Sequence, residues 1–73
     1  MKTVFDCDKN EKVEVVKLHA PGELKQRFIS FGILKGASVK ILEYAPSKAT
    51  IEVRVGKMNI ALRSVEAKMI EVK

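Results

Sequence analysis

Two short segments joined by two residues constrain the fold of this chain more than any other feature. In residues 51–55, and again in residues 58–62, every second side chain is large and apolar. Successive side chains of a strand point to opposite faces, so each segment predicts a strand with one apolar face. The two residues between the segments are Gly56 and Lys57, and glycine in the first position is typical of a type II′ hairpin turn. The sequence therefore predicts a β-hairpin with a positive φ at Gly56.

This turn also predicts the register of the hairpin. A two-residue loop places its flanking residues opposite each other, and the pairing continues outward along both strands. The six apolar side chains then share one face, which should lie against the core. The expected pairs are Val55 with Met58, Val53 with Ile60, and Ile51 with Leu62.

Three further segments have the composition of strands. Residues 12–18 contain a doubled valine, Val15-Val16, which predicts a bulge or burial of both faces. In residues 39–44, Val39 and Ile41 alternate with Lys40 and Leu42, and residues 69–72 predict the last strand. The expected inner face of the sheet comprises Val39, Ile41, Ile51, Val53, Val55, Ile60, Leu62, Ile70 and Val72.

A short helix is predicted after the first of these strands. Pro21 suits its first turn, because the missing N–H would have no partner there. Leu24, Phe28 and Phe31 fall on one helical face, which should pack on the core. Gly32 should end the helix, since glycine accepts the left-handed conformation at that point without a steric penalty.

Turns and a lead-in complete the predicted organisation. Gly36 should form a tight turn before the next strand, and Ser64 should cap a helical turn that runs through Ala67. Residues 1–11 are rich in charged and turn-forming side chains and predict a weakly specified lead-in. We therefore expect residues 1–73 to form a single, mainly β domain. It should be a small barrel of about five strands, closed or nearly closed, with a helical turn before the last strand.

Few side chains could carry catalysis. Cys7 is the only cysteine and His19 the only histidine, so the pair does not supply a closed four-ligand metal site. The glycines do not form a phosphate-binding loop motif. We therefore expect no enzymatic activity, no cofactor and no tight metal site. A weak metal site at Cys7, His19 or surface carboxylates stays open at this stage.

The charge pattern bears on partners and location. The formal charge is +5, from 14 basic and 9 acidic residues that are spread along the whole sequence, as on an ordinary solvated surface. Barrels that bind single-stranded nucleic acid use outward aromatic side chains and a focused basic groove. Tyr44 is the one aromatic residue expected at the surface, so nucleic acid is not the expected partner. No apolar run approaches the roughly 18 residues needed to span a bilayer, and we expect a cytoplasmic protein.

Several segments follow one another in an order that is typical of a known family. They include Arg27–Gly36, Ile51–Gly56, Ile60–Arg63 and Ile70–Val72. In this order and spacing the chain resembles the FeoA family over residues 12–72. The family often has Gly-Asp-Pro after an Ala-Pro pair, where this chain has Ser47-Lys48-Ala49.

The resemblance implies an SH3-like barrel and an accessory, regulatory role in bacterial ferrous iron uptake. It implies one partner, the cytosolic part of the FeoB-type membrane GTPase transporter, so that the membrane would be reached only through the transporter. The protein would be a monomer or a weak homo-oligomer. Two alternatives stay open: a metal-sensing SH3-like module and a small nucleic-acid-binding barrel.

The residues expected to contact the partner are Tyr44, Pro46 and Lys48. They lie in or beside the loop of residues 45–49, which a proline stiffens and which therefore loses less entropy on binding. Tyrosine offers both apolar area and a hydroxyl to an interface, and Lys48 could meet an acidic patch.

Overall fold

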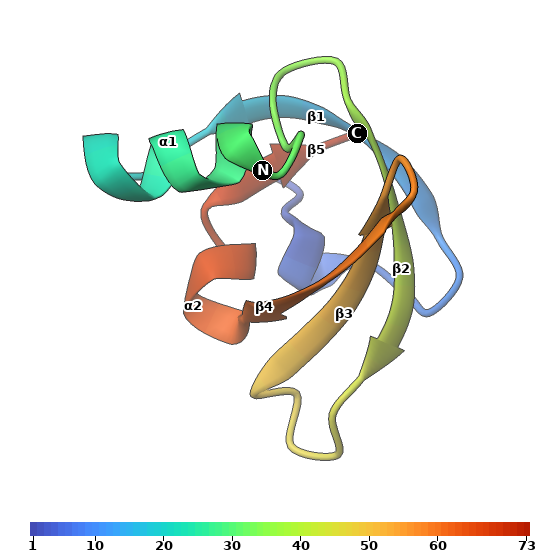
Figure 1. The fold of residues 1–73 in the computed structure, drawn as a ribbon. Coiled ribbons are helices and arrows are strands. Elements are labelled where there is room, and N and C mark those ends of the chain that lie inside the picture. Colours follow the sequence, from blue (N-terminus) through green and yellow to red (C-terminus); the bar gives the residue numbers. More distant parts are fainter.

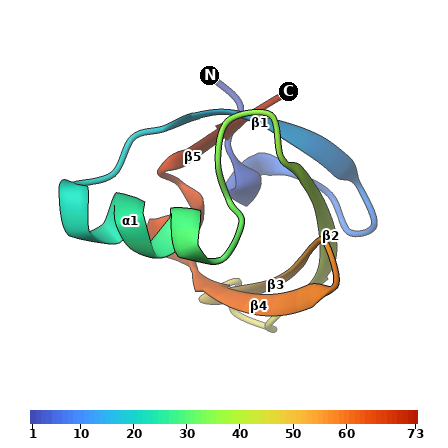
Figure 2. The ribbon, with the colours of Figure 1, turned by 45° about the horizontal axis from the view of Figure 1, so that its top comes forward.

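The computed structural model describes residues 1–73 and contains five strands in one antiparallel sheet (Figure 1). In chain order the elements are η1 (Val4–Asp6), β1 (Lys12–Leu18), α1 (Gly22–Ser30), β2 (Ser38–Tyr44), β3 (Thr50–Val55), β4 (Met58–Arg63), α2 (Ser64–Ala67) and β5 (Ile70–Val72). The strand order is β4-β3-β2-β1-β5, and the sheet curls around the core without pairing its two edge strands (Figure 2). The predicted mainly β class, with a helix after the first strand and a helical turn before the last, is confirmed.

The β3–β4 hairpin has the predicted register. Val55 pairs with Met58, and the pairing continues through Val53 with Ile60 to the far end of the strands. Gly56 has a φ of +61° while Lys57 does not have a positive φ, which distinguishes a type II′ turn from type I′. Met58 differs from the expectation of a core position, because it lies directly beside the turn of the hairpin and is 49% exposed.

A bulge in β1 divides this strand between two partners. Its first half pairs with β2 and its second half with β5, and the register shifts between Val15 and Lys17. The doubled valine therefore marks a bulge, which was one of the two alternatives expected from the sequence. A bulge bends a strand and increases its twist, which lets one sheet wrap around the core. A second shift, between Ile41 and Glu43, bends β2 against β3 in the same way.

Residues 1–11 are better ordered than the weakly specified lead-in that was expected. Val4 and Cys7 are buried in the core, and the backbone N–H of Val72 donates to the carbonyl of Lys2. The Thr3 N–H and hydroxyl both donate to the Asp6 carboxylate, at 2.9 and 3.1 Å. The polar residues that suggested a loop therefore close the short helix η1, and the apolar residues between them fill the core beside β5.

The helix α1 follows the sequence pattern closely. Phe28 is buried, while Leu24 and Phe31 are partly buried against the core. Gly32, Gly36 and Gly56, which the sequence places in turns, have φ values of +89°, +90° and +61°. After Gly32 the N–H of Ile33 donates back to the Phe28 carbonyl, and Ile33 is fully buried.

The helical turn before β5 is capped differently from the prediction. Ser64 is the first helical residue of α2 and not its cap. The preceding residue, Arg63, occupies the cap position, and its N–H donates to the Glu66 carboxylate at 2.8 Å. An acidic side chain in the first turn accepts a hydrogen bond from the free N–H, and its negative charge interacts favourably with the positive end of the helix dipole.

Burial along β4 predicts unequal costs for two truncations on the same face. Ile60→Ala should lower the free energy of unfolding by about 2–5 kcal/mol, because Ile60 is 8% exposed and its loss leaves a cavity. Met58→Ala should cost well under half as much, since its side chain is half exposed. Urea unfolding followed by circular dichroism measures both. A loss below about 0.5 kcal/mol for Ile60→Ala would contradict its core position.

The positive φ of Gly56 predicts that a substitution there lowers stability through the backbone conformation and not through a steric clash. Gly56→Val should destabilise the protein by about 1–3 kcal/mol, because a β-branched residue resists a positive φ. Gly22→Val is the matched control, since neither glycine has an atom within 4 Å of an added Cβ and only Gly56 has a positive φ. Equal thermal stability of the two variants would show that the turn conformation is not the constraint.

Candidate protein-binding site

The loop after β2 places one of the predicted partner-binding residues, Lys48, over two aromatic rings, one of which belongs to another predicted residue, Tyr44. Lys48 has a left-handed backbone with a φ of 58°, and its N–H donates to the Ala45 carbonyl at 2.8 Å. This turn carries the Lys48 Nζ to 4.6 Å from the centre of the Tyr44 ring and to 5.3 Å from that of Phe5. Lys68, which follows α2, lies over the same Phe5 ring at 4.6 Å. Phe5, Tyr44, Lys48 and Lys68 together are called the aromatic–lysine cluster below.

Tyr44 is held from inside the protein. Its hydroxyl donates to the Cys7 carbonyl, and the ring is partly buried. Burial, with a smaller effect of the Cys7 thiolate and nearby carboxylates, raises the pKa of Tyr44 above its usual value. The phenol therefore stays protonated at neutral pH and keeps its bond to Cys7. Only the ring face of Tyr44, and not the hydroxyl, is left for an external partner.

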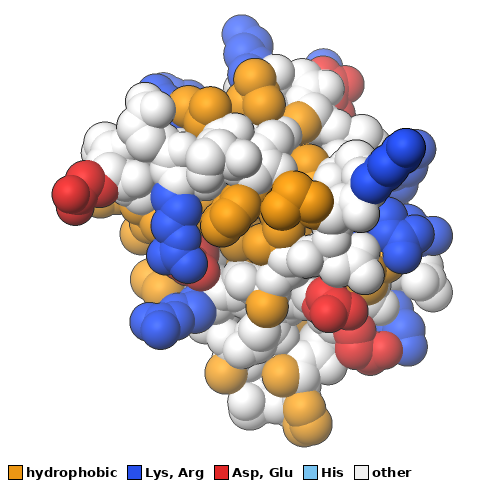
Figure 3. All heavy atoms as spheres, in the orientation of Figure 1, with side chains coloured by type: hydrophobic (Ala, Val, Ile, Leu, Met, Phe, Trp, Pro, Cys, Tyr) orange, Lys and Arg blue, Asp and Glu red, His pale blue; other side chains and the backbone are white.

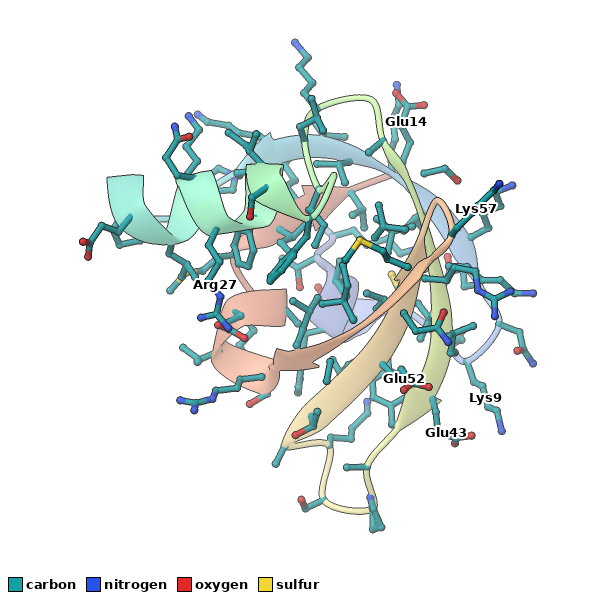
Figure 4. The ribbon with its side chains drawn as sticks, viewed as in Figure 1. Lys9, Glu14, Arg27, Glu43, Glu52 and Lys57 are labelled. Carbon is teal, nitrogen blue, oxygen red and sulfur yellow. The ribbon has the colours of Figure 1, made fainter.

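Pro46 lines a shallow depression beside this cluster. The depression has a volume of about 340 Å³ and lies over β2, β3 and the neighbouring part of β4. Two carboxylates at its rim, Glu43 and Glu52, belong to paired positions of β2 and β3. Figure 4 shows both beside Lys9, whose ammonium lies 3.1 Å from Glu43. The structure thus places Tyr44 and Pro46 along one depression, with Lys48 packed on the adjoining rings.

A second surface, which the sequence reasoning did not single out, is apolar. Ile29, Leu34 and Met58 are 37%, 45% and 49% exposed. Gly32 approaches Val55, so the end of α1 lies next to the hairpin, and Figure 3 shows hydrophobic side chains gathered between these elements. One available signal was Leu34, a large apolar residue inside a turn. The exposure of Met58 had no such signal, because alternation placed it on the core face.

The two residues considered for metal binding have other partners. Cys7 is buried, its Sγ donates to the Thr3 carbonyl at 3.4 Å, and burial raises its pKa to about 11. The thiol is therefore protonated at neutral pH, whereas metals bind the thiolate. His19 lies with its Nε2 2.7 Å from the Glu71 carboxylate. The structure contains no group of three or more His, Cys, Asp or Glu side chains placed to hold a metal ion.

None of the helices of the protein has the length and apolar character needed to cross a bilayer.

Known proteins match this chain in sequence over nearly its whole length, and solved structures match its fold. The family model of the FeoA domain matches residues 2–73. The chain belongs to the FeoA family. A Helicobacter pylori protein named "Putative Fe(2+) transport protein A" is 38% identical over 72 residues, which cover 97% of this chain and 95% of that protein. This FeoA chain is therefore matched along nearly its whole length.

Solved structures of other family members share the fold of this FeoA chain. The FeoA protein of Chlorobium tepidum superimposes with a TM-score of 0.92 at 28% identity, over 97% of this chain and 68% of that one. FeoA of Stenotrophomonas maltophilia, solved with zinc and described as a prokaryotic SH3 domain protein, gives a TM-score of 0.86 at 26% identity. The match covers 100% of this chain and 91% of that one. The SH3-like fold expected from the sequence is confirmed.

The surroundings of Cys7 and His19 generate a prediction about metal. Anaerobic calorimetry with ferrous iron, or calorimetry with zinc, should show no one-to-one binding to this FeoA tighter than roughly 1 µM. The physical reason is that the thiol is buried and protonated while the imidazole already has a carboxylate partner. A tight isotherm that disappears in Cys7→Ser or His19→Ala would contradict this and would favour a metal-sensing module.

Proposed function

We propose that this chain is a cytoplasmic, non-enzymatic accessory protein of ferrous iron uptake that binds the cytosolic part of a FeoB-type transporter GTPase. The observation that carries the proposal is the match of the FeoA domain to residues 2–73. The name of the H. pylori relative refers to ferrous iron transport, and the S. maltophilia protein is described as a possible activating factor for that transport. A chain of this family would regulate its transporter as a monomer or a weak homo-oligomer.

The chemistry of the described side chains supports binding over catalysis. The single cysteine is buried and protonated, and the single histidine is paired with Glu71. The depression beside Pro46 is shallow and lies on the outside of a small sheet. A regulator that binds without chemistry acts only through different affinities for two states of its target. The accessory protein would therefore bind one conformation of the transporter more tightly than another.

The surface we propose for this contact is the ring face of Tyr44 with Pro46 and Lys48. Lys48 is already held over the Tyr44 and Phe5 rings, and Pro46 restricts the loop backbone. Side chains that are ordered before binding lose less conformational entropy in the complex. Lys48 and Lys68 have no ion-pair partner within the protein, so both ammonium groups are available to a partner carboxylate.

The apolar surface of Ile29, Leu34 and Met58 is a second candidate for the same contact. Exposed apolar side chains gathered on one face often mark protein interfaces. Arg27, on the same helix as Ile29, lies 5.9 Å from the centre of the Phe31 ring and 3.6 Å from the Glu66 carboxylate. The two surfaces lie on different elements, so variants can separate them.

The test is a titration of the purified cytosolic domain of the transporter from the same organism against this protein. Pro46→Ala combined with Lys48→Ala should weaken binding roughly tenfold, about 1.4 kcal/mol. Tyr44 is left unchanged because its hydroxyl supports the fold. Lys25→Ala is the control, since it removes one exposed charge from α1 and should leave the affinity within about twofold.

A second variant, Leu34→Ser combined with Met58→Ser, decides between the surfaces. If it loses binding while the loop variant binds like the parent, the apolar surface is the interface and the loop assignment is wrong. If the parent itself does not bind the transporter domain in either nucleotide state, the proposed partner is wrong. Circular dichroism of each variant shows whether it is folded.

A further inference from the structure

Three cations form a row across the outer face of the sheet. Lys12 of β1 is the Cα partner of Lys40 of β2, and Lys40 is in turn the partner of Arg54 of β3. All three side chains are exposed, because they alternate with core residues along their strands. Neighbouring strands are about 4.8 Å apart, so the row extends across about 10 Å of the sheet. These three residues are called the basic row below.

No acidic side chain of the protein forms an ion pair with a member of the basic row. Like charges directly opposite each other on paired strands destabilise a sheet. The ion pairs of the structure use Lys2, Lys9, His19 and Arg27, and none of them includes a member of the row. Arg54 has one further contact, in which its Nε donates to the Asn59 side chain at 3.1 Å and fixes the guanidinium. The fold therefore keeps three positive charges together that repel one another.

The basic row lies in a depression whose lining consists of hydrogen-bond donors. The depression has a volume of about 440 Å³ and is lined by Asn10, Lys12, Ser38, Lys40, Arg54 and Gly56. No carboxylate and no apolar side chain is among them. Ammonium, guanidinium, amide and hydroxyl groups that converge in this way match the oxygen atoms of a phosphate group, and arginine and lysine bind such oxyanions strongly.

We propose that this depression binds a short linear chain of phosphate groups, such as a triphosphate. The cations are aligned along about 10 Å, so successive phosphate groups of one chain can each meet a cation. A nucleobase finds no aromatic surface there, since the lining contains no aromatic residue. The inference goes beyond the proposed function and does not depend on which protein is the partner.

Carboxylates on the same face favour a compact anion over an extended one. Glu14 lies two residues after Lys12 on β1, and Glu52 lies two residues before Arg54 on β3, so each shares the outer face. Glu43 is the paired neighbour of Glu52. Figure 4 shows Glu14 toward one end of this face and Glu43 and Glu52 toward the other. A membrane surface or a nucleic-acid backbone crossing the whole face would meet these negative charges, whereas a short phosphate chain fits between them.

The test is a titration of the whole protein with sodium triphosphate at low ionic strength, followed by amide chemical shifts and by calorimetry. We expect saturable one-to-one binding with the largest shifts at Lys12, Lys40 and Arg54. Lys40→Gln and Arg54→Gln should each weaken binding roughly tenfold or more, because each removes a charge-assisted contact. Lys25→Gln removes an equal charge from α1 and should change the affinity less than about twofold. Inorganic phosphate should bind at least about tenfold more weakly than triphosphate.

Thermal unfolding separates a binding role of Lys40 from a structural one. Without ligand, Lys40→Gln should have a melting temperature equal to or above that of the parent, because the substitution relieves repulsion in the row. At one fixed concentration, triphosphate should raise the melting temperature of the parent more than that of the variant, because the variant binds it more weakly. A lower melting temperature for the ligand-free variant would show that Lys40 supports the fold instead.

Other outcomes overturn the proposal. If triphosphate does not saturate, or if Lys25→Gln weakens binding as much as Lys40→Gln does, the protein attracts anions only through its net charge. Guanosine triphosphate that binds much more tightly than triphosphate would show recognition of the base. Phosphatidylglycerol vesicles and single-stranded DNA are the extended alternatives. If either binds more tightly than triphosphate, and if that binding depends on Lys40, the ligand is an extended polyanion and the proposal of a compact one is wrong.

Discussion

The fold depends on the pairing of β1 with two partners at once. Val15 is fully buried at the point where the strand changes partner, and its N–H and carbonyl are bonded to Ala37 and Gly36 of the segment before β2. Residues 12–14 of the strand pair with β2, and from Val15 onward the strand pairs with β5, beside which the N-terminal segment packs. This irregular position, together with the second shift in β2, bends the sheet around its own core. A chain of this length needs such curvature in order to bury 17 apolar residues in one cluster.

The same curvature decides what the outer face presents. Inward positions of β2 and β3, such as Val39 and Val53, are filled by the core, so their neighbours Lys40 and Arg54 must face the solvent. The bulge after Ile41 shifts the register of β2 and brings Glu43 opposite Glu52. Like charges are thereby grouped: cations form a row on one part of the face, and carboxylates lie at the rim of the depression beside Pro46.

Local patterns in the sequence predicted the hairpin, the bulge in β1 and the end of α1, because each depends on residues that are near one another in the chain. The N-terminal segment was not predictable in this way, since Val4 and Cys7 are buried by strands that follow much later. The aromatic–lysine cluster has the same origin, because Phe5, Tyr44, Lys48 and Lys68 are far apart in the sequence and only the folded chain brings them together. The basic row was not predictable from the sequence either. The sequence spreads its basic residues evenly, and only the pairing of β1, β2 and β3 aligns three of them.

The fold itself does not require cations in that row. An outward position of a strand needs only a polar side chain, and Ser38 and Asn59 meet this need on the same face without a charge. Several carboxylates elsewhere have a cation as ion-pair partner, as Glu11 has Lys2 and Glu43 has Lys9. Three paired cations without such a partner lower the stability of a protein that has little to spare. Since neither the alternation of the strands nor the core accounts for them, their arrangement is best explained by an anion from outside the chain.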